Sequence, residues 1–178
     1  VFAPGGDGLP DRSRPLFQLE RACFRRFGFT SHAVHINGHT ADGRHWIGRR
    51  AAHKAIDPNL LDNLAAGGLP EAEAPFDCVT RELFEEAGVP FEIAARARPT
   101  GMFRTTRNEL NGTHDEILMV YDLLLPDDFV PHAQDGEVAG FQLLDAAQIV
   151  DVLHDFTWDA GRVVAAALLA EPSFSPAR

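Results

Sequence analysis

The chain has 178 residues, of which 45% are apolar and 24% are charged, and its 16 basic and 26 acidic side chains give a formal net charge of −10. This composition predicts one globular domain with a real core and excludes a chain that is disordered throughout. No apolar run reaches the roughly 18–20 residues of a membrane-spanning helix, and the acidic charge argues against a nucleic acid polymer as partner. The two cysteines, Cys23 and Cys78, are too few for a disulfide scaffold and predict a reduced, cytoplasmic protein.

The first part of the chain predicts a tail, a helix and a hairpin. Residues 1–15 are rich in Gly, Pro and charge, which is typical of a tail or linker. From Leu16 to Phe27 apolar residues recur at helical spacing. Segments 31–37 and 44–50 flank two turn dipeptides and predict a β-hairpin. Residues 51–75 show no period, and so long a stretch between ordered elements is often functional.

The segment 76–87 is the clearest helix in the sequence. Pro75 suits the first helical position and Gly88 suits the residue after the end, although Ala74 is a poor capping residue. One apolar stripe runs along the segment at i, i+3, i+7 and i+11, made of Phe76, Val79, Leu83 and Ala87.

The remainder of the chain predicts three strands and two closing helices. The strands are expected near 91–106, 115–125 and 139–144, and the helices at 145–153 and 159–170. Strands and helices are therefore mixed along the chain, which predicts an α+β fold or an α/β/α sandwich.

Three glutamates lie beside the apolar stripe of the 76–87 helix: Glu82, Glu85 and Glu86. At about 100° per residue they span an arc of roughly 100°, where like charges repel and a hard divalent cation finds oxygen ligands. Taken alone, these residues also fit a solvated acidic face in which Arg81 pairs with Glu85.

The residues before the helix separate these two interpretations. Gly67 is followed by five residues and Glu73, and then by seven residues and the run Arg81-Glu82-Leu83-Phe84-Glu85-Glu86-Ala87-Gly88-Val89. This pattern resembles the Nudix box at all nine constrained positions. The chance of such a match is on the order of one in a billion per starting position at average residue frequencies.

The resemblance implies a Nudix hydrolase with a mixed central sheet, an α/β/α sandwich and a loop-helix-loop catalytic motif. It also implies Mg²⁺ or Mn²⁺ as cofactor and a small diphosphate substrate, whose charge the cation neutralises while it lowers the pKa of a bound water. By the resemblance, the metal ligands are the Gly67 carbonyl and the side chains of Glu82, Glu85 and Glu86. Glu73 and Arg81 match a pair that holds the loop against the helix.

Two roles stay open among several residues. The general base is expected to be Glu85 or Glu116, with Glu116 on a strand near the helix glutamates, and Glu137 is a third candidate. For the substrate phosphates the candidates are Arg49, Arg50, Arg104 and Arg107; because strand side chains alternate, only one of Arg49 and Arg50 is expected to reach the substrate. Trp46, Phe103 and Phe141 suit either core packing or stacking on a heterocycle.

A wider resemblance covers roughly residues 16–170. Segments 46–50, 61–63, 121–123 and 135–138, together with Lys54, are similar to a Nudix subgroup related to thiamine pyrophosphokinase fusion proteins and to plant Nudix proteins. The subgroup implies hydrolysis of thiamine diphosphate or its oxidised analogues to the monophosphate. It also implies that residues 1–30 are a tail and helix left from an N-terminal region, and that residues 31–178 form the Nudix domain.

Other functions remain open in the sequence. The same chemistry fits a nucleoside diphosphate linked to a sugar, and some Nudix domains bind a ligand without cleaving it, although those usually carry a broken box. Isomerase chemistry is disfavoured because no matching cysteine-centred motif is present. The expected partner is a small diphosphate, with no nucleic acid polymer and no membrane, and a homodimer is left open.

Overall fold

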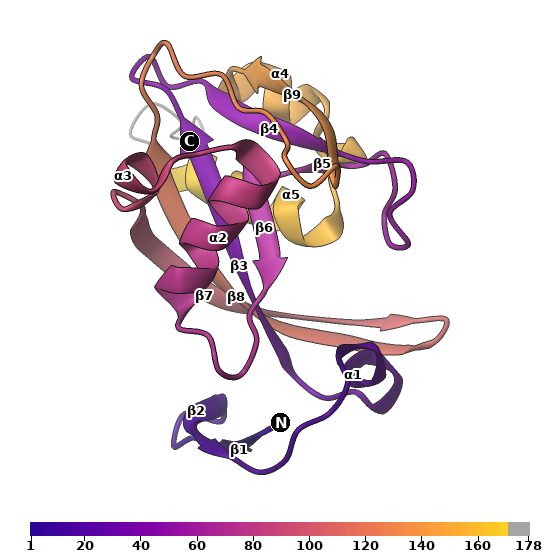
Figure 1. Ribbon diagram of the computed structural model, residues 1–178. Helices are drawn as coiled ribbons and strands as arrows, with labels where there is room; N and C mark the ends of the chain where they lie inside the picture. Colours follow the sequence, from indigo (N-terminus) through magenta and orange to yellow (C-terminus); the bar gives the residue numbers. More distant parts are fainter. Residues whose placement is uncertain (171–178) are drawn as a thin grey trace, which may run out of the picture.

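A seven-stranded mixed sheet is the centre of the computed structural model, which describes residues 1–170 (Figure 1). The strands follow the order β5-β4-β3-β8-β7, while β6 pairs with β3 and β9 pairs with β4. Their bounds are β3 (Ser31–His39), β4 (His45–Arg50), β5 (Leu61–Asp62), β6 (Ala65–Gly68), β7 (Arg98–Glu109), β8 (Gly112–Leu124) and β9 (Val138–Leu144). The pair β3–β8 is parallel and the other pairs are antiparallel, so the sheet is mixed.

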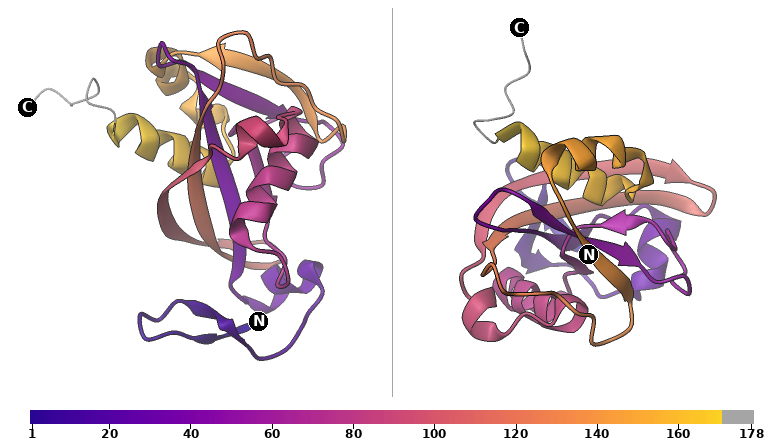
Figure 2. Two further views of the ribbon diagram at one scale, coloured as in Figure 1. Left: turned by 60° about the vertical axis from the view of Figure 1, so that its left-hand side comes forward. Right: turned by 90° about the horizontal axis from the view of Figure 1, so that it is seen from above.

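Helices cover both faces of this sheet (Figure 2). The helices on the faces are α2 (Pro75–Ala87), α3 (Phe91–Ala94), α4 (Ala146–Asp151) and α5 (Trp158–Ala170), with a short 3₁₀ helix η1 (Leu153–Asp155), and α1 (Arg21–Phe27) lies at the end of the sheet beside the turn between β7 and β8 (Figure 1). Val34 and Ile36 of β3 pack with Leu83 of α2 in one core, whereas Ala33 packs with Val163 of α5 on the other side. Alternate side chains of one strand thus fill two cores, and the predicted α+β sandwich is confirmed.

Helix α2 forms where local signals predict it. Pro75 occupies its first turn, and Ala74 is extended and offers no side-chain cap. Asp77 in the first turn places a negative charge at the positive end of the helix. Gly88 ends the helix with φ +65, a left-handed conformation that glycine adopts without strain.

The N-terminal residues differ from the expectation of a tail. Strands β1 (Phe2–Pro4) and β2 (Pro10–Pro15) pair into an antiparallel hairpin, which lies next to the loop that leads into α2 (Figure 1). The predicted helix at 16–27 is confined to α1, which begins at Arg21. The hairpin is ordered by contacts with residues about 60 positions away, which a local composition signal does not contain.

Two further predictions need correction. Residues 91–94 form helix α3 after Pro90, so the strand predicted from 91 begins only at Arg98. The stretch 51–75 contains β5 and β6. The predicted hairpin is confirmed by the antiparallel pair of β3 and β4, which pairs at two positions because β6 occupies the adjoining part of the β3 edge. Within residues 1–170, the apolar helical segments are too short to cross a bilayer.

Candidate active site

Strand β6 and helix α2 bring the predicted metal ligands together. Glu82 and Glu86 are 8% and 7% exposed, and the backbone N–H of Ala66 donates a hydrogen bond of 2.8 Å to Glu86 Oε2. A methyl group added at Gly67 would overlap the Glu82 carboxylate, so only glycine leaves that side chain where it lies. Glu85 is more exposed and faces the solvent side of this group.

One arginine ties the loop before α2 to two of these glutamates. Arg81 Nε and Nη2 each donate to the Glu73 carboxylate at 2.9 Å, a bidentate pair. Its Nη1 donates to Glu82 Oε1 at 2.7 Å and to Glu85 Oε2 at 3.0 Å. The hydrogen bonds that Arg81 donates to Glu73 hold the pKa of its guanidinium above the usual range, so the guanidinium stays charged.

Burial and neighbouring negative charges disfavour the ionised forms of Glu82 and Glu86. Burial raises the pKa of Glu86 well above its usual value, and the charges of Asp62 and Glu82 act in the same direction. Burial also raises the pKa of Glu82, and the charge and hydrogen bond of Arg81 oppose that shift. Several desolvated carboxylate oxygens that repel one another are a donor set that Mg²⁺ or Mn²⁺ fits. The residues present therefore suit the divalent cation that the box implies.

Two segments distant in sequence complete the surroundings. The backbone N–H of Gln134 donates to Glu85 O at 2.9 Å and that of His132 to Ala87 O at 3.1 Å, so this segment satisfies carbonyls at the end of α2. Glu137 follows it, forms an ion pair with Lys54 and raises the pKa of Glu82 through its charge. The hydrogen bond from Lys54 lowers the pKa of Glu137, so this carboxylate stays ionised.

Sequence reasoning assigned no role to Lys54 or Asp62. Two signals in the sequence point to them: both residues match the subgroup, and Lys54 is the only lysine of the chain. Asp62 lies close enough to raise the pKa of Glu86, and it accepts a hydrogen bond of 2.8 Å from Arg50 Nη1. The site thus has a cationic side, formed by Lys54 and Arg50, beside its acidic centre.

Glu116 lies away from the helix glutamates, on the α5 face of the sheet. Leu118 and Val120, which share its parity on β8, pack against Val163 of α5. Glu116 Oε1 accepts a hydrogen bond of 2.8 Å from Ser31 Oγ. The expected position near the helix glutamates is therefore wrong, because one residue of register decides which face of the sheet a strand side chain takes.

Glu116 belongs instead to a second polar cluster. Ligand atoms of His114, Glu116 and Asp159 lie within 4.8 Å of one another. His114 Nε2 is 3.0 Å from Asp159 Oδ2, and Arg107 Nη1 donates to both Asp159 oxygens at 3.0 and 3.2 Å. Because Arg107 already neutralises Asp159, this cluster is explained as a partly buried ion-pair network.

The arginines predicted to bind phosphate all have partners within the chain. Arg49 Nη1 donates to Asn59 O at 2.7 Å. Arg50 pairs with Asp62 and also donates to the carbonyls of the following loop. Arg104 lies on β7 and forms a bidentate pair with Asp115, with both distances 2.7 Å. Only Arg50 is linked to a residue of the acidic centre, through Asp62.

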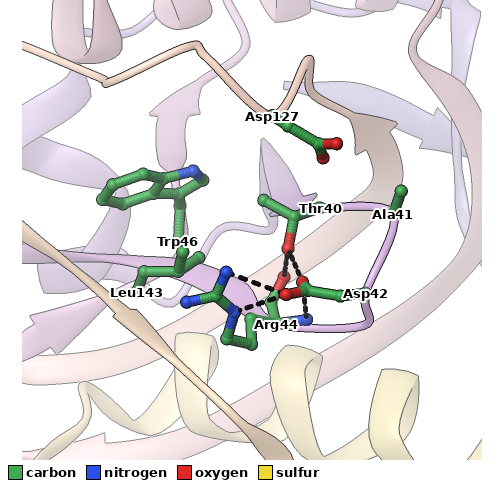
Figure 3. A pocket seen from close by; sticks show the side chains of 7 residues that line it. All are labelled: Thr40, Ala41, Asp42, Arg44, Trp46, Asp127 and Leu143. Atoms are coloured by element: carbon green, nitrogen blue, oxygen red, sulfur yellow. Dashed lines mark hydrogen bonds and ion pairs between the residues drawn. The ribbon is translucent and has the colours of Figure 1, made fainter.

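Of the three aromatic candidates, Trp46 and Phe141 pack against the same core, and Phe103 lies on the opposite side of the sheet. Phe141 packs against the core beneath α2, and Phe103 packs on the α5 side, where Arg162 Cζ lies 5.3 Å from its ring centroid. Trp46 lines a cavity of about 480 Å³ at the turn between β3 and β4, beside Arg44 and Asp127 (Figure 3).

This cavity lies beyond the end of β3, whereas Gly67 pairs with Val34 near the middle of that strand. Thr40 is six residues beyond Val34, which corresponds to roughly 20 Å of extended chain. A second cavity of about 560 Å³ lies between the N-terminal hairpin and β7 and β8. Neither cavity is lined by the helix glutamates.

Comparison with known proteins supports the interpretation of this site. The family model described as NUDIX domain matches residues 32–167. Nudix hydrolase 20, chloroplastic, of Arabidopsis thaliana is 40% identical over 148 residues, which cover 81% of this chain and 40% of that protein. The chain thus spans about two fifths of the length of this relative and of Nudix hydrolase 24, chloroplastic, of the same plant.

Solved structures show the same fold. The crystal structure of DR0079 from Deinococcus radiodurans superposes with a TM-score of 0.63 at 24% identity, covering 76% of this chain and 82% of the other. The NUDIX domain of Shewanella oneidensis NrtR, crystallised with ADP ribose, superposes with a TM-score of 0.60 at 15% identity, covering 76% and 84%. At these identities the likeness concerns the fold alone.

Proposed function

Because the chain belongs to the NUDIX domain family, we propose that it is a Mg²⁺- or Mn²⁺-dependent hydrolase that cleaves the diphosphate bond of a small organic diphosphate. One observation carries the proposal: Glu82 and Glu86 are both buried, mutually repelling and held against β6. A surface helix with a solvated acidic face would leave these carboxylates in water, where no cation is needed to stabilise them.

Each residue of the site has a part in the proposed reaction. Glu82, Glu85 and Glu86 hold the cation, with the Gly67 carbonyl as a further oxygen, and Arg81 keeps two of these carboxylates oriented. A bound divalent cation supplies charge neutralisation for the phosphate oxygens and lowers the pKa of a water molecule.

We assign the general base to Glu85 first and to Glu137 second. Both carboxylates border the acidic centre, and both are more exposed than Glu82 and Glu86, so a substrate can reach them. Glu116 is third, because the sheet separates it from α2. The Glu→Gln variants at 85, 137 and 116 test this order. The variant that removes the general base should lose on the order of 10²–10⁴-fold in kcat, and its kcat should no longer fall at low pH through protonation of that base.

For the substrate we propose thiamine diphosphate or an oxidised analogue, cleaved to the monophosphate. Support comes from the flanking segments that match the thiamine-related subgroup and from the 40% identity to a plant Nudix hydrolase. The second candidate is a nucleoside diphosphate linked to another group, because the same cation chemistry would cleave that diphosphate bond. The cytoplasmic location and the homodimer stay predictions.

The test measures phosphate release from thiamine, oxythiamine and nucleotide diphosphates, and release of AMP and ribose 5-phosphate from ADP ribose, by wild type, Glu86→Gln and Glu92→Gln. Glutamine at 86 still accepts the Ala66 hydrogen bond but lacks the charge, so we expect a folded protein with almost no activity. Glu92 is exposed on α3, so the same substitution there should leave activity unchanged. An active Glu86→Gln protein would contradict the metal assignment, and a preference for ADP ribose would overturn the thiamine proposal.

A further inference from the structure

The N-terminal hairpin contacts the loop that carries Glu73. Arg12, on β2, places its Nη2 against three backbone carbonyls of this loop: Pro70 at 2.9 Å, Glu71 at 3.2 Å and Glu73 at 2.9 Å. The loop belongs to the box and lies between β6 and α2 (Figure 1). Arg12 itself lies outside residues 32–167, so a residue beyond the family match holds part of the matched motif.

Other contacts fix the position of the Arg12 guanidinium. The Phe2 ring of β1 lies against it, with its centroid 5.3 Å from Arg12 Cζ, and packs edge-on to His32 at 5.6 Å between ring centroids. The carbonyl of His32 accepts a hydrogen bond of 2.8 Å from Leu69 N. Hairpin, strand β3 and the start of the loop therefore form one connected group.

The loop 69–74 has modest support of its own. In the described part of the chain its backbone N–H groups make two hydrogen bonds outside helices and strands, Leu69 N to His32 O and a long one of 3.4 Å from Glu73 N to Pro70 O. Arg12 Nη2 adds charge-assisted hydrogen bonds to three carbonyls of the loop, and because this nitrogen carries two hydrogens, at least one of them is shared between two carbonyls. Glu73 is therefore held from two sides, with its backbone carbonyl against Arg12 and its carboxylate against Arg81.

We propose that Arg12 is a positioning residue for the cation site. It fixes the backbone of Glu73, whose carboxylate orients Arg81, and Arg81 in turn orients Glu82 and Glu85. Each link is a hydrogen bond of 2.7–3.0 Å. The consequence for catalysis rests on the proposed function, but the effect on cation binding can be measured without any substrate.

The experiment compares wild type, Arg12→Ala, Arg12→Lys and Arg14→Ala in the full chain. Arg14 lies on the same strand and makes a single long hydrogen bond of 3.5 Å to Pro4 O, so it is the matched control. Mn²⁺ binding is followed by electron paramagnetic resonance of the free ion, and hydrogen exchange is followed in peptides covering 69–74 and 81–86. Both are recorded well below the midpoint of thermal unfolding.

We expect Arg12→Ala to weaken Mn²⁺ binding about tenfold, the lower end of the range for residues that orient metal ligands. Exchange should rise in both peptides, and Arg12→Lys should restore part of both effects because lysine keeps the charge but has a shorter reach. Arg14→Ala should match wild type. If Arg12→Ala does not fold, Arg12→Lys decides, since it keeps a donor at this position.

If Arg12→Ala binds Mn²⁺ with the affinity of wild type, the inference is overturned. If Arg12→Ala does not fold, the same result for a folded Arg12→Lys protein overturns it. Equal losses in the Arg12 and Arg14 variants would do the same, because they would indicate a general effect of the hairpin. A wild-type protein that binds no Mn²⁺ would overturn the proposed function instead, and the exchange of 69–74 would still decide whether Arg12 holds the loop.

Discussion

The substitution Gly67→Ala separates cation binding from folding. Gly67 lies in strand β6 with an extended backbone, which alanine adopts without strain. An added methyl group would overlap Oε1 and Cδ of Glu82 and lie 2.6 Å from its Oε2. These atoms are the end of a flexible side chain, so the carboxylate moves while the backbone stays in place.

The size of the movement follows from this overlap. Glu82 must retreat by roughly 1.5 Å before its carboxylate reaches a van der Waals separation of about 3.5 Å from the methyl group. A cation site tolerates ligand distances within about 0.2 Å, so Glu82 is lost as a ligand. Misplacement of about 1 Å costs on the order of 10²-fold in rate, and we expect at least that loss of phosphate release. The free energy of unfolding should change by less than about 1 kcal/mol.

The assay pairs Gly67→Ala with Gly68→Ala in Mn²⁺ binding, phosphate release and thermal unfolding. At Gly68 the added methyl group would lie 3.3 Å from Arg21 Cζ, and this exposed side chain can move away. Gly68→Ala should therefore stay within about threefold of wild type, a free-energy difference below about 0.7 kcal/mol. If Gly67→Ala also binds Mn²⁺ like wild type, the reasoning on Glu82 is refuted.

Three further predictions concern the cation, the core and acid stability. EDTA should abolish phosphate release and Mg²⁺ or Mn²⁺ should restore it, so activity of a metal-free preparation would contradict the proposed cation. Mn²⁺ at 100 times Kd should stabilise the fold by about 2.7 kcal/mol. Leu83→Ala, at a fully buried position, should lower the free energy of unfolding by about 2–5 kcal/mol, whereas Phe84→Ala, 52% exposed, should change it far less in the same urea titration. Burial opposes ionisation of Asp115, but hydrogen bonds from Arg104 and the neighbouring threonines outweigh it and lower its pKa to about 2. The ionised carboxylate therefore stabilises the fold by about 1–2 kcal/mol, after allowance for screening, above pH 4, and this contribution is lost between pH 4 and 2. The difference in free energy of unfolding between wild type and Asp115→Asn should close over that range, and a constant difference would count against the assignment.

Short-range signals were sufficient for the catalytic helix. Pro75, the apolar stripe and Gly88 act within one element, and the predicted helix 76–87 differs from α2 by one residue. The same holds for the spacing of Gly67, Glu73 and the helix glutamates, because a covalent chain of fixed length brings them into one loop and helix. These residues alone predicted the family and the fold.

Other features depend on contacts between distant residues. Glu116 lies on the α5 face of the sheet because of the register between β3 and β8, and a shift of one residue would have turned it toward α2. Lys54 meets Glu137 across 83 positions, and Arg12 meets the carbonyl of Glu73 across 61. No local pattern contains such pairs.

Sequence by itself therefore determined the family and the position of the acidic helix, and it predicted the cation chemistry proposed for that helix, because all of these depend on one loop-and-helix segment. Only the tertiary structure decided which carboxylates and arginines surround it and that the N-terminal hairpin supports its loop. The physical reason is that side-chain burial and ion pairing depend on strand register and packing, which are set by the whole sheet.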